Sequence, residues 1–148
     1  MVNIKELHEL FRNKLEISPK SRSSIVLRDI ASFLTKPGLI NIEVNDLNKL
    51  IHSSKRMIAM SAKARGNERS HIIGRKIVAN IGDMFRDKKA TNVLFNITGS
   101  PDLTLYEVNE VAEYIYNIVA ADANIIFGAV IDEKKKDYVN ATVIFGSK

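Results

Sequence analysis

The chain has 148 residues, 45% of them hydrophobic, and a formal net charge of +5. That length suits one compact domain with a core, and the absence of cysteine excludes disulfides, thiolate catalysis and cysteine metal sites. No apolar run approaches the roughly 18 residues of a membrane-spanning helix, and residues 1–6 are too charged for a signal peptide. We therefore expect a cytoplasmic protein without a membrane span.

The first third of the chain predicts helices. Apolar residues three and four positions apart indicate a short amphipathic helix within residues 1–20. A second helix is predicted over residues 24–35. Pro37 and Gly38 end it, because a proline disfavours helix at the residue before it and glycine supplies the turn. Residues 45–54 predict a further short helix after the loop.

The middle of the chain alternates strands and helices. Residues 56–64 and 91–98 are predicted as strands, the second because it is rich in branched and aromatic residues. A helix is predicted between them, over residues 68–81. Thr104 and Glu107 have the spacing of a capping box, in which each side chain satisfies the other residue's backbone N–H, and an apolar stripe continues from there to about residue 120.

The last part of the chain predicts two strands. Residues 124–131 are nearly all apolar, as in a central strand, whereas residues 138–145 alternate, as in a half-exposed strand. A charged turn of six residues separates them and indicates an antiparallel hairpin. The predicted fold class is α+β: a four-stranded mixed β-sheet in the order β-α-β-α-β-β, with helices packed on it and preceded by two helices.

The charges form two opposite blocks. Residues 51–89 contain ten Lys or Arg against three Asp or Glu, a net charge of +7, and residues 90–133 contain no Lys or Arg and seven Asp or Glu, a net charge of −7. Such blocks are compatible with solvated faces, with head-to-tail association of like subunits, or with nucleic-acid binding at the basic end. The basic 55–76 stretch lacks interleaved aromatic residues, so a nucleic-acid role rests on charge alone.

Most candidate sites for chemistry are weak. The loop over residues 96–102 joins a strand to a helix, where phosphates can bind, but it has one glycine, no phosphate-loop motif, and an acid at Asp102. His8, His52 and His71 lie in different segments without metal-ligand spacing. We expect no metal site and no cofactor bound by the chain alone.

The loop over residues 38–46 differs, since Asn41, Glu43 and Asp46 place an amide and two acids within six positions. From the residues alone, Asp46 reads as the N-cap of the helix that follows.

Three stretches resemble the FtsZ branch of the tubulin/FtsZ family. They are residues 34–41 (LTKPGLIN), residues 94–99 with 102–110 (LFNITG and DLTLYEVNE), and residues 122–133 (DANIIFGAVIDE). The resemblance covers about residues 27–146 and is to the C-terminal domain of FtsZ. It predicts a family-like domain over residues 27–148, preceded by a helical segment over residues 1–26 that does not clearly match.

The resemblance implies a function in cell division. FtsZ is a GTPase that polymerises head to tail. The loop after its central helix, the synergy loop, enters the nucleotide pocket of the next subunit, where its acids help to position or activate the attacking water in trans. The matching positions here are Asn41, Glu43 and Asp46, where Glu43 is one methylene longer than the usual aspartate. The glycine-rich GTP-binding loop of the family is absent, so the chain alone is expected not to be an enzyme, and GTP would be bound by an FtsZ-type partner subunit.

Three interpretations remain open. The first is a polymerisation module that supplies its synergy loop in trans. The second is a truncated regulator that caps filaments of full-length FtsZ, and other division proteins are also conceivable partners. The third is a nucleic-acid-binding protein on a borrowed fold.

Overall fold

A single mixed sheet organises the molecule, whose computed structural model describes residues 4–11, 14–19, 21–81 and 89–147. Its five strands lie in the order β1-β2-β5-β3-β4. β1 pairs parallel with β2, β3 pairs parallel with β4, and β5 lies between β2 and β3, antiparallel to both. The strands are β1 (Leu15–Ile17), β2 (Arg56–Ala64), β3 (Ala90–Gly99), β4 (Val119–Ile131) and β5 (Val139–Ser147).

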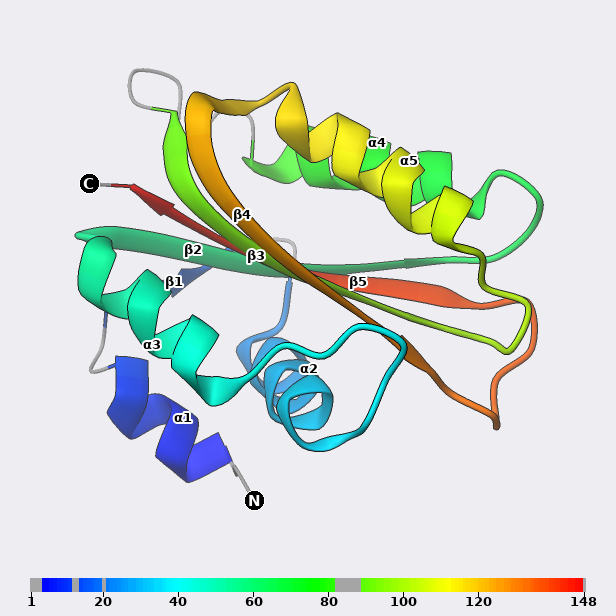
Figure 1. Ribbon diagram of the computed structural model, residues 1–148, viewed down its shortest axis with the longest axis horizontal. Helices are drawn as coiled ribbons and strands as arrows, with labels where there is room; N and C mark the ends of the chain where they lie inside the picture. Colours follow the sequence, from blue (N-terminus) through cyan, green and yellow to red (C-terminus); the bar gives the residue numbers. More distant parts are fainter. Residues whose placement is uncertain (1–3, 12–13, 20, 82–88, 148) are drawn as a thin grey trace.

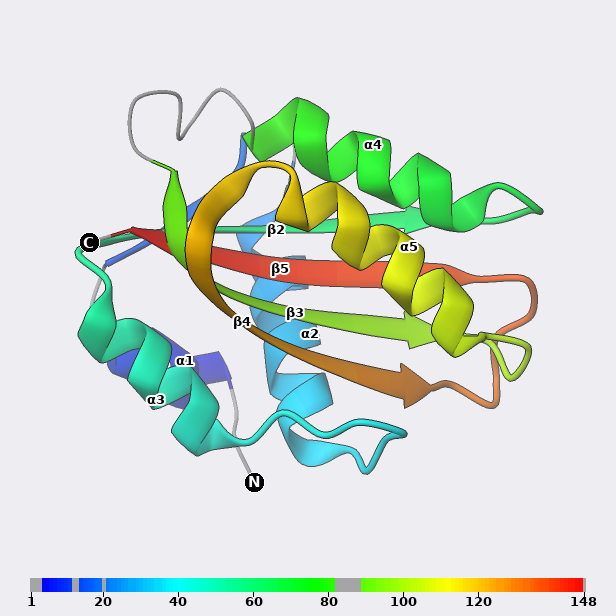
Figure 2. The same ribbon diagram turned by 45° about the horizontal axis from the view of Figure 1, so that its top comes forward.

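Helices cover both faces of the sheet (Figures 1 and 2). One face carries α1 (Ile4–Phe11), α2 (Ser23–Thr35) and α3 (Val44–Ser53), and the other carries α4 (Arg69–Ile81) and α5 (Leu105–Tyr116). Each face has its own apolar core, because successive side chains of a strand point to opposite sides. In β3, for example, Phe95 packs into the core beneath α4 and α5, whereas Leu94 packs into the core beneath the first three helices.

The fold class predicted from the sequence is confirmed. The strand predicted over residues 56–64 has those bounds, and the helices predicted over residues 24–35, 45–54 and 68–81 begin and end within one residue of α2, α3 and α4. The capping box is also present, with the Glu107 N–H donating to Thr104 Oγ1 at 3.1 Å and the Thr104 N–H donating to Glu107 Oε1 at 3.2 Å.

Four details of the prediction are wrong. The sheet has five strands rather than four, because Leu15–Ile17 extends along β2 instead of continuing the first helix. The helix predicted to reach residue 120 ends at Tyr116, since Val119 pairs with Ala90 as the first residue of β4. The two last strands do not form a hairpin, because β5 inserts between β2 and β3.

The fourth correction concerns burial. β4 was expected to be central and β5 half-exposed, but β4 lies at the edge of the sheet and β5 at its centre. The alternating polar residues of β5 are covered rather than solvated: Thr142 is 1% exposed, and the Asn140 amide donates to Asp29 of α2 at 3.2 Å. A polar partner on a facing helix thus lets a polar strand face lie in the interior.

Candidate functional site

The loop between α2 and α3 is fixed to the edge strand β4. α2 ends at Thr35, and Ile40 then exchanges two backbone hydrogen bonds with Ala129, with N–O distances of 3.2 and 2.9 Å. Figure 2 shows the loop running out to the carboxyl end of β4 and back into α3. The loop is therefore held at its midpoint by the sheet and at both ends by helices.

Two glycines allow this close approach. A Cβ atom at Gly38 would overlap the carbonyl oxygen of Ala129, and one at Gly128 would lie 2.9 Å from the carbonyl oxygen of Ile40 and 2.8 Å from the side chain of Ile42. Ile42 itself is 3% exposed and packs into the core beneath α2 and α3. The backbone of the loop is consequently determined by packing rather than by solvent.

The structure places all three predicted site residues on this loop or on the helix turn that follows it. Asn41 is exposed, and its Oδ1 accepts a hydrogen bond from the Gly38 N–H at 2.8 Å. Glu43 is exposed, and Asp46 is half-buried. Glu43 and Asp46 meet at the first turn of α3, where Asp46 Oδ2 accepts a hydrogen bond from the Glu43 N–H at 2.9 Å. The buried Ile42 separates them along the chain from Asn41.

Asp46 is not the N-cap residue of α3. Glu43 occupies that position with an extended backbone (φ −103°, ψ 158°), and Asp46 lies three residues later. Its carboxylate still satisfies one free N–H at the helix start, so it has a structural role alongside any chemical one. Two exposed apolar side chains lie close to the acids along the chain, since Leu39 is 59% and Val44 36% exposed.

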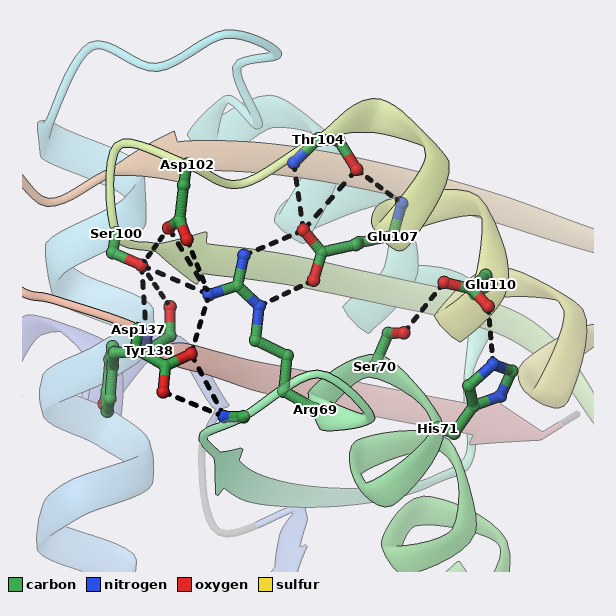
Figure 3. A network of polar contacts seen from close by, with 11 residues as sticks. Arg69, Ser70, His71, Ser100, Asp102, Thr104, Glu107, Glu110, Asp137 and Tyr138 are labelled. Atoms are coloured by element: carbon green, nitrogen blue, oxygen red, sulfur yellow. Dashed lines mark hydrogen bonds and ion pairs between the residues drawn. The ribbon is translucent and has the colours of Figure 1, made fainter.

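A second polar site, not predicted from the sequence, joins α4 to α5 (Figure 3). Arg69 is 5% exposed and forms two hydrogen bonds with the Glu107 carboxylate, at 2.6 and 2.8 Å. It also contacts Asp102 at 3.3 Å and Asp137 at 3.5 Å. The hydrogen bond from Arg69 holds the pKa of Glu107 below its ordinary value, against the opposing effect of burial.

The same interface carries a smaller cluster along the two helices. Glu110 Oε2 lies 2.6 Å from His71 Nε2, and its other oxygen accepts a hydrogen bond from the Ser70 hydroxyl at 2.9 Å. His71 Nδ1 lies 3.1 Å from the Tyr114 hydroxyl. The basic and acidic sequence blocks therefore meet inside the molecule, where α4 and α5 pack together. The opposite net charges of the two blocks are the one sequence signal that could have indicated such pairing, although it was not predicted from them.

The loop over residues 96–102 is occupied by this network. Ser100 Oγ accepts a hydrogen bond from the Tyr138 N–H at 2.9 Å, and Asp102 lies against both Ser100 and Arg69. The pKa of Asp102 is lowered, first by the Ser100 hydroxyl and also by Arg69. Because its side chains bond to Arg69 of α4 and to the Tyr138 backbone, this strand-to-helix junction serves to anchor the α4–α5 interface.

Two negative findings apply to the part of the chain that the structure describes. Within residues 4–11, 14–19, 21–81 and 89–147, no three His, Asp or Glu side chains gather as a metal-ligand group. No helix among these residues is long and apolar enough to cross a membrane.

Comparison with known proteins identifies the family. A family model described as "FtsZ family, C-terminal domain" matches residues 57–147. The cell division protein FtsZ of Magnetospirillum gryphiswaldense is 33% identical over 119 residues, which are 80% of this chain and 21% of that protein. FtsZ of Bartonella bacilliformis is 34% identical over 116 residues, 78% of this chain and 20% of that protein. The chain thus spans about a fifth of the length of these curated relatives.

Solved structures show the same fold at low identity. A mutant FtsZ of M. jannaschii superposes with a TM-score of 0.72 at 19% identity, covering 97% of this chain and 50% of that one. A TubZ protofilament structure from Bacillus thuringiensis gives a TM-score of 0.61 at 18% identity, covering 82% of this chain and 33% of that one. Together with the family model, these similarities show that the chain belongs to the FtsZ family, whose C-terminal domain it contains.

Proposed function

We propose that the chain is an assembly module for an FtsZ-type filament in cell division, and that its loop over residues 38–46 enters the nucleotide pocket of a neighbouring FtsZ-type subunit. The observation that supports this most is the attachment of the loop to β4 by two backbone hydrogen bonds, combined with the exposure of Asn41 and Glu43. A surface that must reach into another molecule needs a fixed backbone, because binding then orders fewer groups.

In this proposal GTP belongs to the neighbouring subunit, and the chain alone is not an enzyme. A carboxylate near the terminal phosphate can orient the attacking water, as positioned side chains do in other nucleotide hydrolases. Glu43 is the exposed acid at the start of α3 and is the candidate for this role in trans. Supplying the group from a second subunit would couple hydrolysis to assembly.

Asp46 acts in this scheme mainly as a positioning residue. One of its oxygens holds the Glu43 N–H and thereby sets the backbone direction at Glu43. Asn41 sets the backbone direction at the other side of the loop, because its side chain accepts a hydrogen bond from the Gly38 N–H. The apolar side chains of Leu39 and Val44, both exposed beside the acids, provide contact area for the neighbour.

The experiment is a titration of the chain into full-length FtsZ, with GTP hydrolysis and filament length as readouts. The wild-type chain should change both. Glu43→Gln should weaken any stimulation of hydrolysis by roughly tenfold or more, because removing one transition-state contact costs about that much or more. Asp46→Asn removes the charge of Asp46 but keeps an oxygen that can accept from the Glu43 N–H. Asp46→Ala removes both the charge and the hydrogen bond, so the two variants together separate these effects.

The matched control is Glu9→Gln, an exposed glutamate of α1. It should behave as the wild type in both readouts. If Glu43→Gln and Glu9→Gln act alike, or if the wild-type chain leaves hydrolysis and filament length unchanged, the trans-acting role of the loop is wrong.

A further inference from the structure

A small hollow lies at the opposite end of α3 from the loop. Its volume is about 230 Å³, and it is lined by Lys49, Leu50 and Ser53 of α3, Asn92 of β3, and Asn124 and Ile126 of β4. The register between β3 and β4 shifts here, from the pair Ala90–Val119 to the pair Asn92–Asn124. Both strands curl away from the rest of the sheet at this end (Figure 1). None of these residues belongs to the 38–46 loop.

Asn92 is the unusual member of the lining. Its side chain is 9% exposed, and its Nδ2 atom has no hydrogen-bond partner among the described residues. Buried amide donors are almost always paired, because an unpaired one loses its hydration without compensation. The Oγ atom of the neighbouring Ser54, 4% exposed, is also unpaired within the described part of the chain. Asn92 therefore brings to the lining of the hollow an amide donor that no described protein group satisfies, and Ser54 brings an unpaired hydroxyl to the adjoining hollow.

The remaining polar groups around the hollow favour a negatively charged acceptor. Lys49 is exposed and brings an ammonium group, and the exposed Asn124 brings a second amide. The Ser53 hydroxyl is already used, since it donates to the Lys49 carbonyl at 2.8 Å. An adjoining hollow shares Ser53 and adds Lys14, His52 and Lys55, which extend the positive potential. No carboxylate is among the residues that line either hollow.

We propose that this hollow binds a carboxylate group, with Asn92 and Asn124 as hydrogen-bond donors and Lys49 as the counter-charge. Its volume is below the range of drug-sized ligand pockets, about 300–1,000 Å³, and suits one acidic side chain or one small dicarboxylate. Both sources offer the same chemistry. The acidic side chain would come from a partner protein that docks beside the edge strand β4.

The test follows the side-chain amide resonances of Asn92 and Asn124 by NMR. Two carboxylates are titrated, glutarate and a blocked Ala-Glu-Ala tripeptide, each against its uncharged counterpart, glutaramide and blocked Ala-Gln-Ala. At least one carboxylate should give saturable shifts that its counterpart does not. Tighter binding of glutarate indicates a small free ligand, and tighter binding of the tripeptide indicates a partner's side chain.

Variants separate binding from structure. Lys49→Gln should weaken carboxylate binding up to about fivefold, the contribution of an exposed ion pair, whereas Lys5→Gln on α1 should not. Asn92→Leu should abolish the saturable shift at Asn124 without lowering the melting temperature, because the Nδ2 donor that it removes has no partner among the described residues. Shifts that do not saturate, or equal shifts from the uncharged counterparts, would overturn the proposal and leave a water-filled hollow. Neither result bears on the 38–46 loop.

Discussion

Replacing Arg69 by methionine (Arg69→Met) should lower the free energy of unfolding by about 3 kcal/mol. Breaking a buried ion pair costs roughly 3–5 kcal/mol, because one charge is left without its partner. The value should fall at the lower end, since Glu107 is 18% exposed and keeps the Thr104 N–H as a hydrogen-bond donor. Asp102 and Asp137 are 65% and 59% exposed, so solvent screens their contacts with Arg69 and these add little to the loss.

The assay is urea unfolding followed by circular dichroism, with thermal melting beside it. For a chain of this size, about 3 kcal/mol corresponds to a fall of roughly 6–12 °C in the melting temperature. Glu107→Gln keeps an oxygen for the Thr104 N–H and removes the charge, so it completes a double-mutant cycle. The double variant should cost clearly less than the sum of the single variants, by more than about 1 kcal/mol.

Two results would show that Arg69 does not stabilise the fold in this way. One is a loss below about 1 kcal/mol for Arg69→Met, which would mean that the network contributes no more than surface ion pairs do. The other is strict additivity in the cycle, which would mean that Arg69 and Glu107 do not depend on each other.

Four further predictions concern acid stability, helix packing, the N-terminal segment and GTP binding. The lowered pKa of Glu107 means that its contribution to stability is complete above pH of about 4.5 and is lost as the pH falls through the lowered value. The free energy of unfolding should therefore fall less steeply with acidification in Arg69→Met than in the wild type. Gly74→Ala should cost about 1–3 kcal/mol in urea unfolding, because a Cβ there overlaps the Tyr114 ring. Leu7→Ala, at a fully buried position, should lower the free energy of unfolding by about 2–5 kcal/mol. A single unfolding transition would show that the 1–26 segment and the 27–148 domain unfold together, and a separate early transition would show that they do not. Calorimetry should detect no GTP binding by the chain alone, and low-micromolar binding would contradict this.

Helix starts and ends were predictable from the sequence where residues close together in the chain determine them. The capping box at Thr104 and Glu107 and the Pro37-Gly38 stop are signals within a few residues, and both appear in the structure where expected. The order of the strands was not predictable in this way. An apolar run such as β4 indicates burial of some kind, but it does not say which strand inserts between which neighbours.

The central position of β5 depended on residues far away in the sequence. Asn140 and Thr142 suggest a solvated face until Asp29, more than a hundred residues earlier, is placed opposite them. Arg69 was missed for the same reason, because it lies in a basic stretch that resembles a solvated helix face. Its three acidic partners come from three other segments, and only the fold brings them together.

The 38–46 loop was located by its residues, and its attachment to the edge strand became evident only from the structure. The backbone pairing of Ile40 with Ala129 and the close approach at Gly38 and Gly128 are long-range contacts. The role of the loop toward a neighbouring subunit stays a prediction.

The most direct test of that role uses the absence of cysteine from the chain. A single thiol is introduced at the exposed loop position in Leu39→Cys or, as the control, on α1 in Glu9→Cys, and its alkylation rate is measured with full-length FtsZ polymerised in a non-hydrolysable GTP analogue. Polymer should slow alkylation at position 39 and leave the rate at position 9 unchanged. Equal rates at position 39 with and without polymer, or slowing at position 9 alone, would contradict the role of the loop toward a neighbouring subunit.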